Sequence, residues 1–143
     1  MKKQIFYINN ENEMANLAKE LAKNSKKCDI FGLKGTLGAG KSFFARAFIN
    51  AFGNETIEVS SPTFTLLNIY EISDRPTIYH FDFYRLNNEN ELINLGIEEA
   101  LIEGISLIEW PEIAKNFLNK NYTEIEIKIA DQNKRLVEIT KIS

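Results

Sequence analysis

The stretch GTLGAGKS, residues 35–42, decides which fold the sequence predicts. Gly35, four further residues, Gly40, Lys41 and Ser42 have the spacing of a Walker A loop. Glycines let the backbone curl so that successive N–H groups point into one concavity, where the dipole of the following helix favours an anion. The lysine adds positive charge near the outer phosphates, and the serine hydroxyl suits a magnesium ion. The stretch therefore predicts a nucleoside triphosphate site made by Gly35, Thr36, Leu37, Gly38, Ala39, Gly40, Lys41 and Ser42.

The segments on either side of the loop predict a strand before it and a helix after it. CDIFGLK, residues 28–34, is a short apolar run followed at once by glycines, which favours a buried strand. KSFFARAFINAF, residues 41–52, contains neither Gly nor Pro and is followed by Gly53, a natural helix stop. Its phenylalanines recur at helical spacing, so we expect them in the core.

The remaining segments predict further elements of the same α/β sheet. Asn10 and Glu13 are typical of a helix cap and its reciprocal partner, and predict a helix that ends at about Ser25. After the loop we expect two paired strands over 57–72 and 77–86, two short helices divided at Gly96 within 87–104, a strand over 105–110, a short helix over 111–118 and an antiparallel hairpin over 122–143. We find no internal repeat or flexible linker, which predicts a single domain over residues 1–143.

Composition and charge restrict the class of protein. The 143 residues, 44% of them hydrophobic, suffice for one domain with its own core. A net charge of -3 argues against a large basic surface that would hold nucleic acid without help. Apolar stretches are too short for a secretory signal or a membrane span, so we expect a cytoplasmic protein that does not bind membranes. The single cysteine, Cys28, precedes an apolar run and is expected to be a buried structural thiol in a reducing compartment.

Two carboxylates are candidates for the metal or water chemistry that a phosphate-binding loop alone does not supply. Asp82 ends the apolar run IYHFD and Glu109 ends the run ISLIE. Both therefore emerge at a strand end, where ligand sites of open α/β sheets lie. Either is a candidate for the Walker B acid, and the alternative for each is a surface carboxylate. Thr63, in SSPTF, is placed like the hydroxyl of a nucleotide-sensing switch, although Ser and Thr beside Pro62 are also ordinary turn formers.

The only histidine and the only tryptophan are expected to pack in the core. His80 lies within a predicted strand and has no neighbouring Cys or His to build a metal cluster. Trp110 follows a strand end, where it could stack on a base or anchor a partner, but core packing is the commoner role.

Five motifs together resemble a known family. GTLGAGKS, SSPTFTLLNIY, HFDFYRL, ELINLGIEEAL and IEWPE, in this order and at these separations, are similar to the TsaE family, formerly YjeE. These are small bacterial ATPases of tRNA threonylcarbamoyladenosine biosynthesis. The resemblance is strong over residues 28–112 and extends only in outline to the first helix and the final hairpin. It implies a P-loop NTPase fold with helices flanking a mixed central sheet, and ATP and Mg²⁺ as ligands, with weak hydrolysis by the chain alone.

The resemblance also implies partners. In the family, the protein docks on a complex of the threonylcarbamoyl transferase subunit and its paralogous partner subunit. Its ATP cycle supports repeated modification of the adenosine beside the tRNA anticodon, and it does not itself transfer the threonylcarbamoyl group. Contact with tRNA would be indirect, through that complex, which agrees with the acidic net charge of this chain.

Residue by residue, the resemblance implies a role for each candidate. Lys41 and the loop amides would hold the phosphates, while Ser42 and Glu109 would bind magnesium. Asp82 would be the Walker B acid beside the metal, and Thr63 the switch residue.

Three positions need separate comment. Thr36 departs from the family, which usually has Asp directly after the first glycine, so no role of that carboxylate carries over. Glu11, near the start of the first helix, and Arg135, in the final hairpin, are candidates for contact with the nucleotide base.

Other classes share the phosphate-binding loop. A small-molecule kinase usually needs a lid with arginines, and few follow the loop: Arg46, Arg75, Arg85 and Arg135. A GTPase would be expected to carry an Asn-Lys-x-Asp signature, and NKRL at 133–136 lacks the Asp. An ATP-sensing module without turnover would use the two carboxylates for the metal only.

Overall fold

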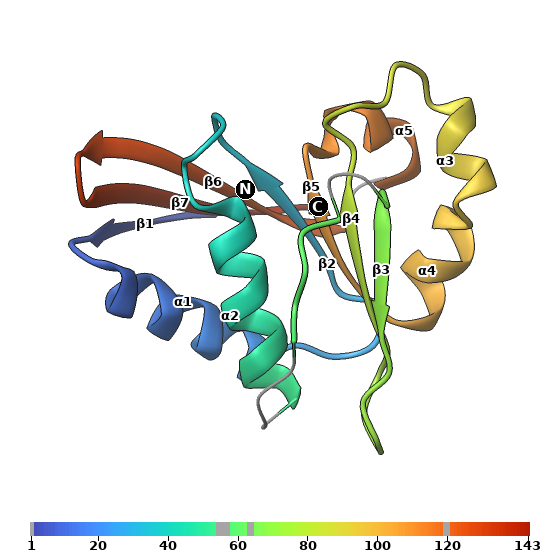
Figure 1. The fold of residues 1–143 in the computed structure, drawn as a ribbon, viewed down its shortest axis with the longest axis horizontal. Coiled ribbons are helices and arrows are strands. Elements are labelled where there is room, and N and C mark those ends of the chain that lie inside the picture. Colours follow the sequence, from blue (N-terminus) through green and yellow to red (C-terminus); the bar gives the residue numbers. More distant parts are fainter. Residues whose placement is uncertain (1, 54–57, 63–64, 119–120) are drawn as a thin grey trace.

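The computed structural model of the chain describes residues 2–53, 58–62, 65–118 and 121–143. Its strands are β1 (Lys3–Ile8), β2 (Ile30–Lys34), β3 (Leu67–Tyr70), β4 (Ile78–Asp82), β5 (Ile105–Glu109), β6 (Tyr122–Asp131) and β7 (Lys134–Ile142). Its helices are α1 (Glu11–Lys23), α2 (Lys41–Gly53), α3 (Asn90–Asn94), α4 (Ile97–Glu103), the 3-10 helix η1 (Pro111–Ala114) and α5 (Lys115–Leu118). The strands form one mixed sheet in the order β1-β7-β6-β2-β5-β4-β3 (Figure 1). The predicted α/β fold with a mixed sheet and a C-terminal antiparallel hairpin is confirmed.

Parallel strands occupy the centre of the sheet. β2 runs parallel to β5 and to β6, and β5 runs parallel to β4. The antiparallel pairs lie outside this centre, where β3 joins β4 and β7 lies between β6 and β1. Because the carboxyl ends of parallel strands meet at one edge of a sheet, the segments that follow β2, β4 and β5 leave the sheet at the same edge.

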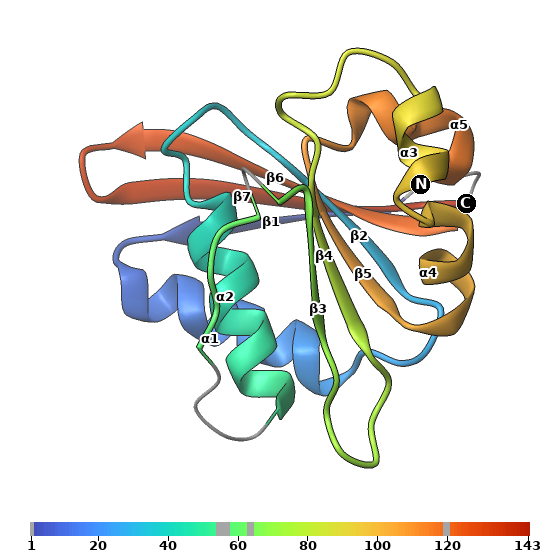
Figure 2. The same ribbon diagram turned by 45° about the vertical axis from the view of Figure 1, so that its right-hand side comes forward.

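Helices cover both faces of the sheet and make two cores. On one face, α1 and α2 pack the fully buried Phe44 and Phe48 against the strands. On the other, α3 and α4 lie on the side of β4 and β5 (Figure 2), and η1, which leads into α5, contacts β2. Leu107 and Ile108, adjacent on β5, belong to different cores, as expected where successive side chains of a strand point to opposite faces.

The predicted cap is present at the start of α1, but the reciprocal hydrogen bond of Glu13 is made one residue earlier than expected. Asn10 Oδ1 accepts a hydrogen bond from the backbone N–H of Glu13 at 2.9 Å. The Glu13 carboxylate accepts from the N–H of Asn9, at 2.8 Å, and so reaches one residue beyond the cap itself. Two of the N–H groups around the helix start are thereby satisfied.

One strand was not predicted. β1 pairs antiparallel with β7 and forms an edge of the sheet. Only Ile8 among its residues is buried, so the strand lacks the alternation that marks a half-buried strand in a sequence. The pair of strands expected over 57–72 and 77–86 is present but shorter, since β3 covers four residues and 58–62 form no strand. Leu66, directly before β3, has a φ of 69°, so the chain is not extended there and the strand begins only at Leu67.

The prediction of a buried Cys28 is wrong. The residue lies in the turn before β2 with a φ of 79°, and its side chain is exposed. Its Sγ lies 3.0 Å from the carbonyl oxygen of Ile102. The apolar run that suggested burial begins only at Ile30, because Asp29 still belongs to the turn and accepts from the N–H of Lys26.

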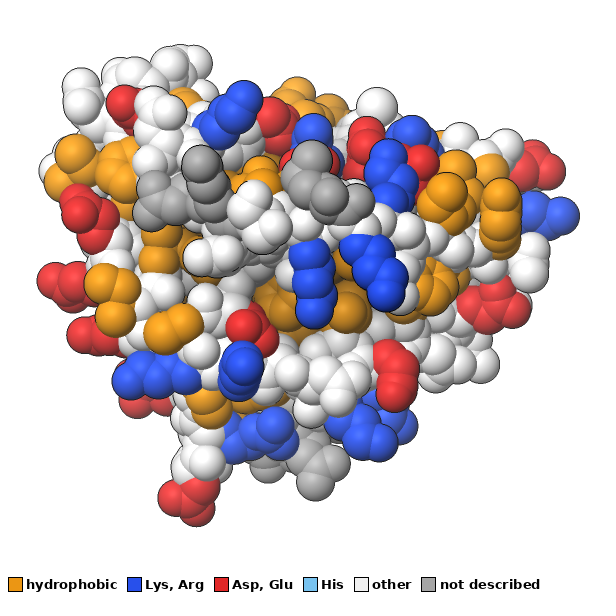
Figure 3. Space-filling model, turned by 180° about the vertical axis from the view of Figure 1, so that it is seen from behind, with side chains coloured by type: hydrophobic (Ala, Val, Ile, Leu, Met, Phe, Trp, Pro, Cys, Tyr) orange, Lys and Arg blue, Asp and Glu red, His pale blue; other side chains and the backbone are white. Residues whose placement is uncertain are grey.

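The described helices and one face of the surface bear on membranes and charge. None of the helices in the described part of the chain is long and apolar enough to cross a membrane. Seen from behind, acidic and basic side chains are interspersed over the molecule (Figure 3). This distribution agrees with the small net charge of -3.

Candidate functional site

The glycine loop connects the buried strand β2 to the start of α2. Gly35, Gly38 and Gly40 have φ angles of 148°, 79° and 119°, which favour glycine. Gly35 also needs to lack a side chain, because a Cβ there would lie 2.5 Å from the carbonyl oxygen of Ile127 on β6. The loop is thus fixed against the sheet at its first glycine, and it ends at the N-terminus of a 13-residue helix.

Lys41 is the first residue of α2 and is almost fully buried, with 5% of its surface exposed. Its ammonium donates to the carbonyl oxygens of Gly35, at 2.6 Å, and Thr36, at 2.9 Å, so it folds back over its own loop. Nζ also lies 4.2 Å from the centroid of the Trp110 ring. Burial lowers the pKa of this ammonium below 10.5, and the nearby carboxylates, chiefly Glu109, oppose the shift.

The Glu109 carboxylate is held from two sides at the end of β5. The Ser42 hydroxyl donates to Oε1 at 3.0 Å and lies 3.3 Å from Oε2. His80 Nε2, on β4, lies 2.7 Å from Oε2. Glu109 is 2% exposed and His80 is 1% exposed, so this pair is shielded from bulk water, while Ser42 is half-buried at the cavity.

Asp82 lies beside Glu109, since the two residues are register partners at the ends of the parallel strands β4 and β5. Asp82 Oδ1 accepts from the backbone N–H of Tyr84 at 3.0 Å. A cavity of about 400 Å³ brings these groups together with the loop. Its lining includes Lys41, Ser42, Asp82, Tyr84, Arg85, Glu109 and Trp110.

A second cavity, of about 590 Å³, lies against the loop and brings together the two residues expected near the base. Glu11, from the start of α1, and Arg135, from β7, line it together with Gly38, Ala39 and Gly40. Arg135 Nε donates to the carbonyl oxygen of Ala39 at 2.8 Å, so the hairpin is joined directly to the loop. Both cavities contain Gly38, Gly40 and Phe43, which connects them through the loop.

The structure thus gathers the loop, Asp82 and Glu109 around one cavity and Glu11 and Arg135 around the other. Thr63 lies outside the described residues. His80 is packed in a strand as expected, yet it also touches the site through Glu109, which the sequence analysis missed. Its position two residues before Asp82, on the same face of the strand, was the available signal.

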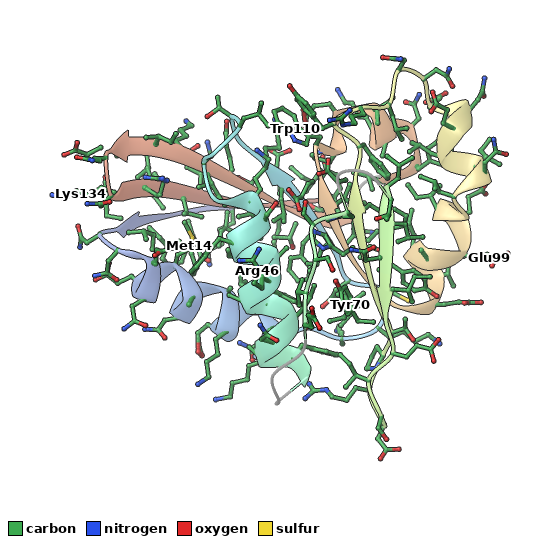
Figure 4. The ribbon with its side chains drawn as sticks, viewed as in Figure 1. Met14, Arg46, Tyr70, Glu99, Trp110 and Lys134 are labelled. Atoms are coloured by element: carbon green, nitrogen blue, oxygen red, sulfur yellow. The ribbon has the colours of Figure 1, made fainter. Side chains whose placement is uncertain are left out.

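Trp110 also belongs to the site. Its ring packs partly against the second core, as predicted, but it also faces Lys41 and lies 4.9 Å from the Tyr84 ring. The left-handed backbone of Trp110, with a φ of 59°, turns the chain sharply after β5. Figure 4 labels this residue near the start of α2, where the loop ends.

The donor atoms fit a hard cation bound jointly with phosphates. Ser42 and Glu109 bring their oxygens within 3.0 Å of each other, and Asp82 follows in register. No group of three or more His, Cys, Asp or Glu side chains that could hold a metal occurs in the described ranges. Magnesium does not need such a group, because it commonly takes one or two protein carboxylates and completes its shell with water and phosphate oxygens.

A strand, glycine loop and helix, faced by carboxylates at the ends of two neighbouring parallel strands, define the P-loop NTPase fold. A family model described as "Threonylcarbamoyl adenosine biosynthesis protein TsaE" matches residues 8–137. The chain belongs to the TsaE family.

Individual relatives agree with this assignment. The chain is 48% identical to a tRNA threonylcarbamoyladenosine biosynthesis protein TsaE of Rickettsia felis over 92% of its length and 77% of the relative. It is 35% identical to the protein of the same name from Bacillus subtilis, over 93% of the chain and 82% of the relative. Among solved structures, Bacillus subtilis YdiB matches with a TM-score of 0.78 and 27% identity, covering 99% of this chain and 87% of that one.

Proposed function

We propose that this chain is a Mg-ATP-binding ATPase that supports tRNA threonylcarbamoyladenosine biosynthesis. The observation that carries the proposal is the convergence of Lys41, Ser42, Asp82 and Glu109 on one cavity beside the glycine loop. Membership of the TsaE family, whose relatives bear the name of this pathway, supports the choice of process.

The phosphates would lie in the concavity of the loop, at the N-terminus of α2. The glycine φ angles shape this backbone, and the helix dipole favours an anion there. Lys41 would exchange the carbonyl oxygens of Gly35 and Thr36 for phosphate oxygens, which bind its charge more strongly. Burial leaves the ammonium poorly solvated, which supports such an exchange.

Magnesium would be held by Ser42 and Glu109, with Asp82 beside them. A bound magnesium ion would supply neutralisation of the negative charge on the phosphates. The protein's own contribution is to keep the two carboxylates buried and fixed at strand ends, so that they need not reorganise during the reaction. The larger cavity, lined by Glu11 and Arg135, would receive the base and sugar of ATP.

The partners would be the threonylcarbamoyl transferase subunit and its paralogous subunit, with tRNA reached through their complex. A net charge of -3 and the mixed charges on the rear surface support an indirect rather than a direct contact with tRNA. The cytoplasm is the compartment in which this modification would take place.

Arg85 lines the smaller cavity, but two of the other arginines are held against the body of the fold, which favours an ATPase over a small-molecule kinase. Arg75 packs over the Phe52 ring at 4.1 Å, and Arg135 is hydrogen-bonded to the loop carbonyl of Ala39. Neither is carried on a lid that could close over a second substrate.

Reconstitution tests the proposal. Purified partners, tRNA and this chain are combined with ATP or with a non-hydrolysable analogue, and the modified adenosine is counted per transferase complex. We expect several modifications per complex only with this chain and hydrolysable ATP. Equal yields without the chain would refute the role, and equal yields with the analogue would indicate an ATP-sensing module in place of an ATPase.

A further inference from the structure

His80 lies in the site but takes no part in the contacts with ATP and magnesium proposed above. It lies on β4 two residues before Asp82, and β4 runs parallel to β5 with Asp82 opposite Glu109. Side chains two apart on a strand share a face, so His80 lies on the same side of the sheet as both carboxylates. It is 1% exposed and therefore contacts no bulk solvent.

The hydrogen bond between His80 and Glu109 takes one direction when the carboxylate is ionised, as a magnesium ligand is. An ionised carboxylate only accepts, so the imidazole nitrogen that faces it, Nε2, carries the proton. Nδ1 is buried, and no described residue supplies it with a hydrogen-bond partner. A neutral ring with its proton on Nε2 leaves only an acceptor unpaired, whereas a doubly protonated ring would bury an unpaired donor and a charge.

This hydrogen bond orients the Glu109 carboxylate between β4 and the loop. His80 holds Oε2 at 2.7 Å, and the nearer oxygen to Ser42 Oγ is Oε1, at 3.0 Å. Rotation of the carboxylate out of this plane would break the His80 contact, so the imidazole fixes the orientation of the carboxylate plane relative to the loop. A ligand carboxylate that is itself hydrogen-bonded is oriented in the same way at other metal sites.

We propose that His80 is a positioning residue that orients the Glu109 carboxylate for the magnesium ion bound with ATP. The proposal rests on the proposed Mg-ATP site. His80 would not touch the nucleotide or the metal, and it would act only through Glu109. Its loss should therefore weaken the contribution of the metal to binding while leaving metal-free contacts with the nucleotide intact.

The test compares His80→Gln with His80→Asn. A glutamine amide can reach the place of Nε2 and donate to Oε2, whereas an asparagine amide ends near the place of Nδ1 and falls short. ATP is titrated calorimetrically into each protein with Mg²⁺ and with EDTA, and the ratio of the two Kd values gives the gain from the metal. We expect His80→Asn to reduce this gain by about 10-fold, the scale of other losses of a residue that orients a metal ligand, and His80→Gln to retain most of it. The Kd values that the wild type and the His80 variants show in EDTA should agree within a factor of about two, because these substitutions change no contact with the phosphates.

Two further variants complete the design. His80→Leu removes every donor at similar volume and serves where His80→Asn does not fold, as judged by circular dichroism. Ser106→Ala changes another fully buried polar side chain, on β5, whose hydroxyl points to the carbonyl oxygen of Ala100 and not to the loop. We expect Mg²⁺ to improve the ATP affinity of Ser106→Ala as much as that of the wild type.

The results separate the two proposals. If Mg²⁺ does not improve the ATP affinity of the wild-type chain, the proposed Mg-ATP site is wrong, and the role of His80, which depends on that site, is refuted as well. If the wild type shows the gain and the folded His80→Asn or His80→Leu protein shows the same gain, only the positioning role is refuted. Equal losses in His80→Gln and His80→Asn would also refute it, because the donated hydrogen bond would then not matter.

Discussion

The Ser42 hydroxyl oxygen lies 3.0 Å from Oε1 of Glu109, although 67 positions separate the two residues in the chain. The contact forms because β2 and β5 are parallel neighbours, so that the loop after β2 and the last residue of β5 emerge at the same edge. Both groups are oxygen ligands of the kind that magnesium prefers. The pair therefore links the phosphate-binding loop to the carboxylates of the sheet.

Replacement of Glu109 by alanine should separate ATP binding from turnover. Glu109→Ala keeps the loop and Lys41, so we expect it to retain ATP. It removes a buried metal ligand, and we expect single-turnover hydrolysis to fall by about 100-fold, the scale of losing one preorganised electrostatic contact. Glu98→Ala, which removes an exposed carboxylate on α4, is the control and should hydrolyse ATP normally. Unchanged turnover in Glu109→Ala would remove Glu109 from the site.

Replacement of Lys41 by alanine should abolish measurable ATP binding. Its ammonium is buried at the loop, and a charge-assisted contact with phosphate is worth up to about 3 kcal/mol, or about 100-fold in Kd. Calorimetric titration with Mg-ATP measures the loss. Lys19→Ala, which removes an exposed lysine of α1, is the matched control and should bind as the wild type does. Wild-type affinity in Lys41→Ala would place the phosphates elsewhere.

The sequence alone predicted those parts of the structure that depend on residues close together in the chain. The glycine loop and its flanking strand and helix follow from local spacing, and α2 begins at Lys41 and ends at Gly53 as expected. The convergence of Asp82 and Glu109 was predictable because each ends a short apolar run, and parallel strands end together.

The sequence was insufficient where structure depends on distant pairing. β1 is an edge strand held by β7, and its exposed residues give no periodic signal. The contact of His80 with Glu109 depends on the register between β4 and β5, and the spacing of His80 and Asp82 indicates only that these two share a face. Trp110 turns toward Lys41 because its backbone is left-handed, and propensity disfavours that conformation for a tryptophan.

Two glycines of the loop should differ sharply in their tolerance of alanine. A Cβ at Gly35 would lie 2.5 Å from the carbonyl oxygen of Ile127, whereas a Cβ at Gly38 would have no heavy atom within 4 Å. Both have positive φ, which costs alanine about 1–2 kcal/mol. We expect Gly38→Ala to lose about that much stability, and Gly35→Ala to lose more and to bind ATP poorly. Urea unfolding and ATP titration measure both effects, and equal losses would contradict the described approach of the loop to β6.

Tyr79 should make the fold sensitive to alkaline pH. Burial raises the pKa of its phenol above 10.0, and Glu103, Glu99 and Glu71 add to the shift. The folded chain therefore keeps this proton at pH values where the unfolded chain has lost it, so the free energy of unfolding falls as pH rises above about 10. Urea unfolding between pH 8 and pH 11 should show a smaller fall for Tyr79→Phe than for the wild type. Parallel curves for the two proteins would contradict the expectation.

Arg135 should stabilise the loop from the C-terminal hairpin. Its Nε donates to the carbonyl oxygen of Ala39, and its side chain lines the larger cavity. Arg135→Ala removes both contacts, and we expect ATP affinity to fall by about 10-fold, since a hydrogen bond from a charged donor is worth roughly 1.5–3 kcal/mol. Arg135→Lys keeps the charge without the planar fork and should give an intermediate value. Lys134, labelled on the hairpin in Figure 4, is exposed, so Lys134→Ala is the control for charge alone. If Arg135→Ala and Lys134→Ala bind ATP equally well, the hairpin does not support the loop.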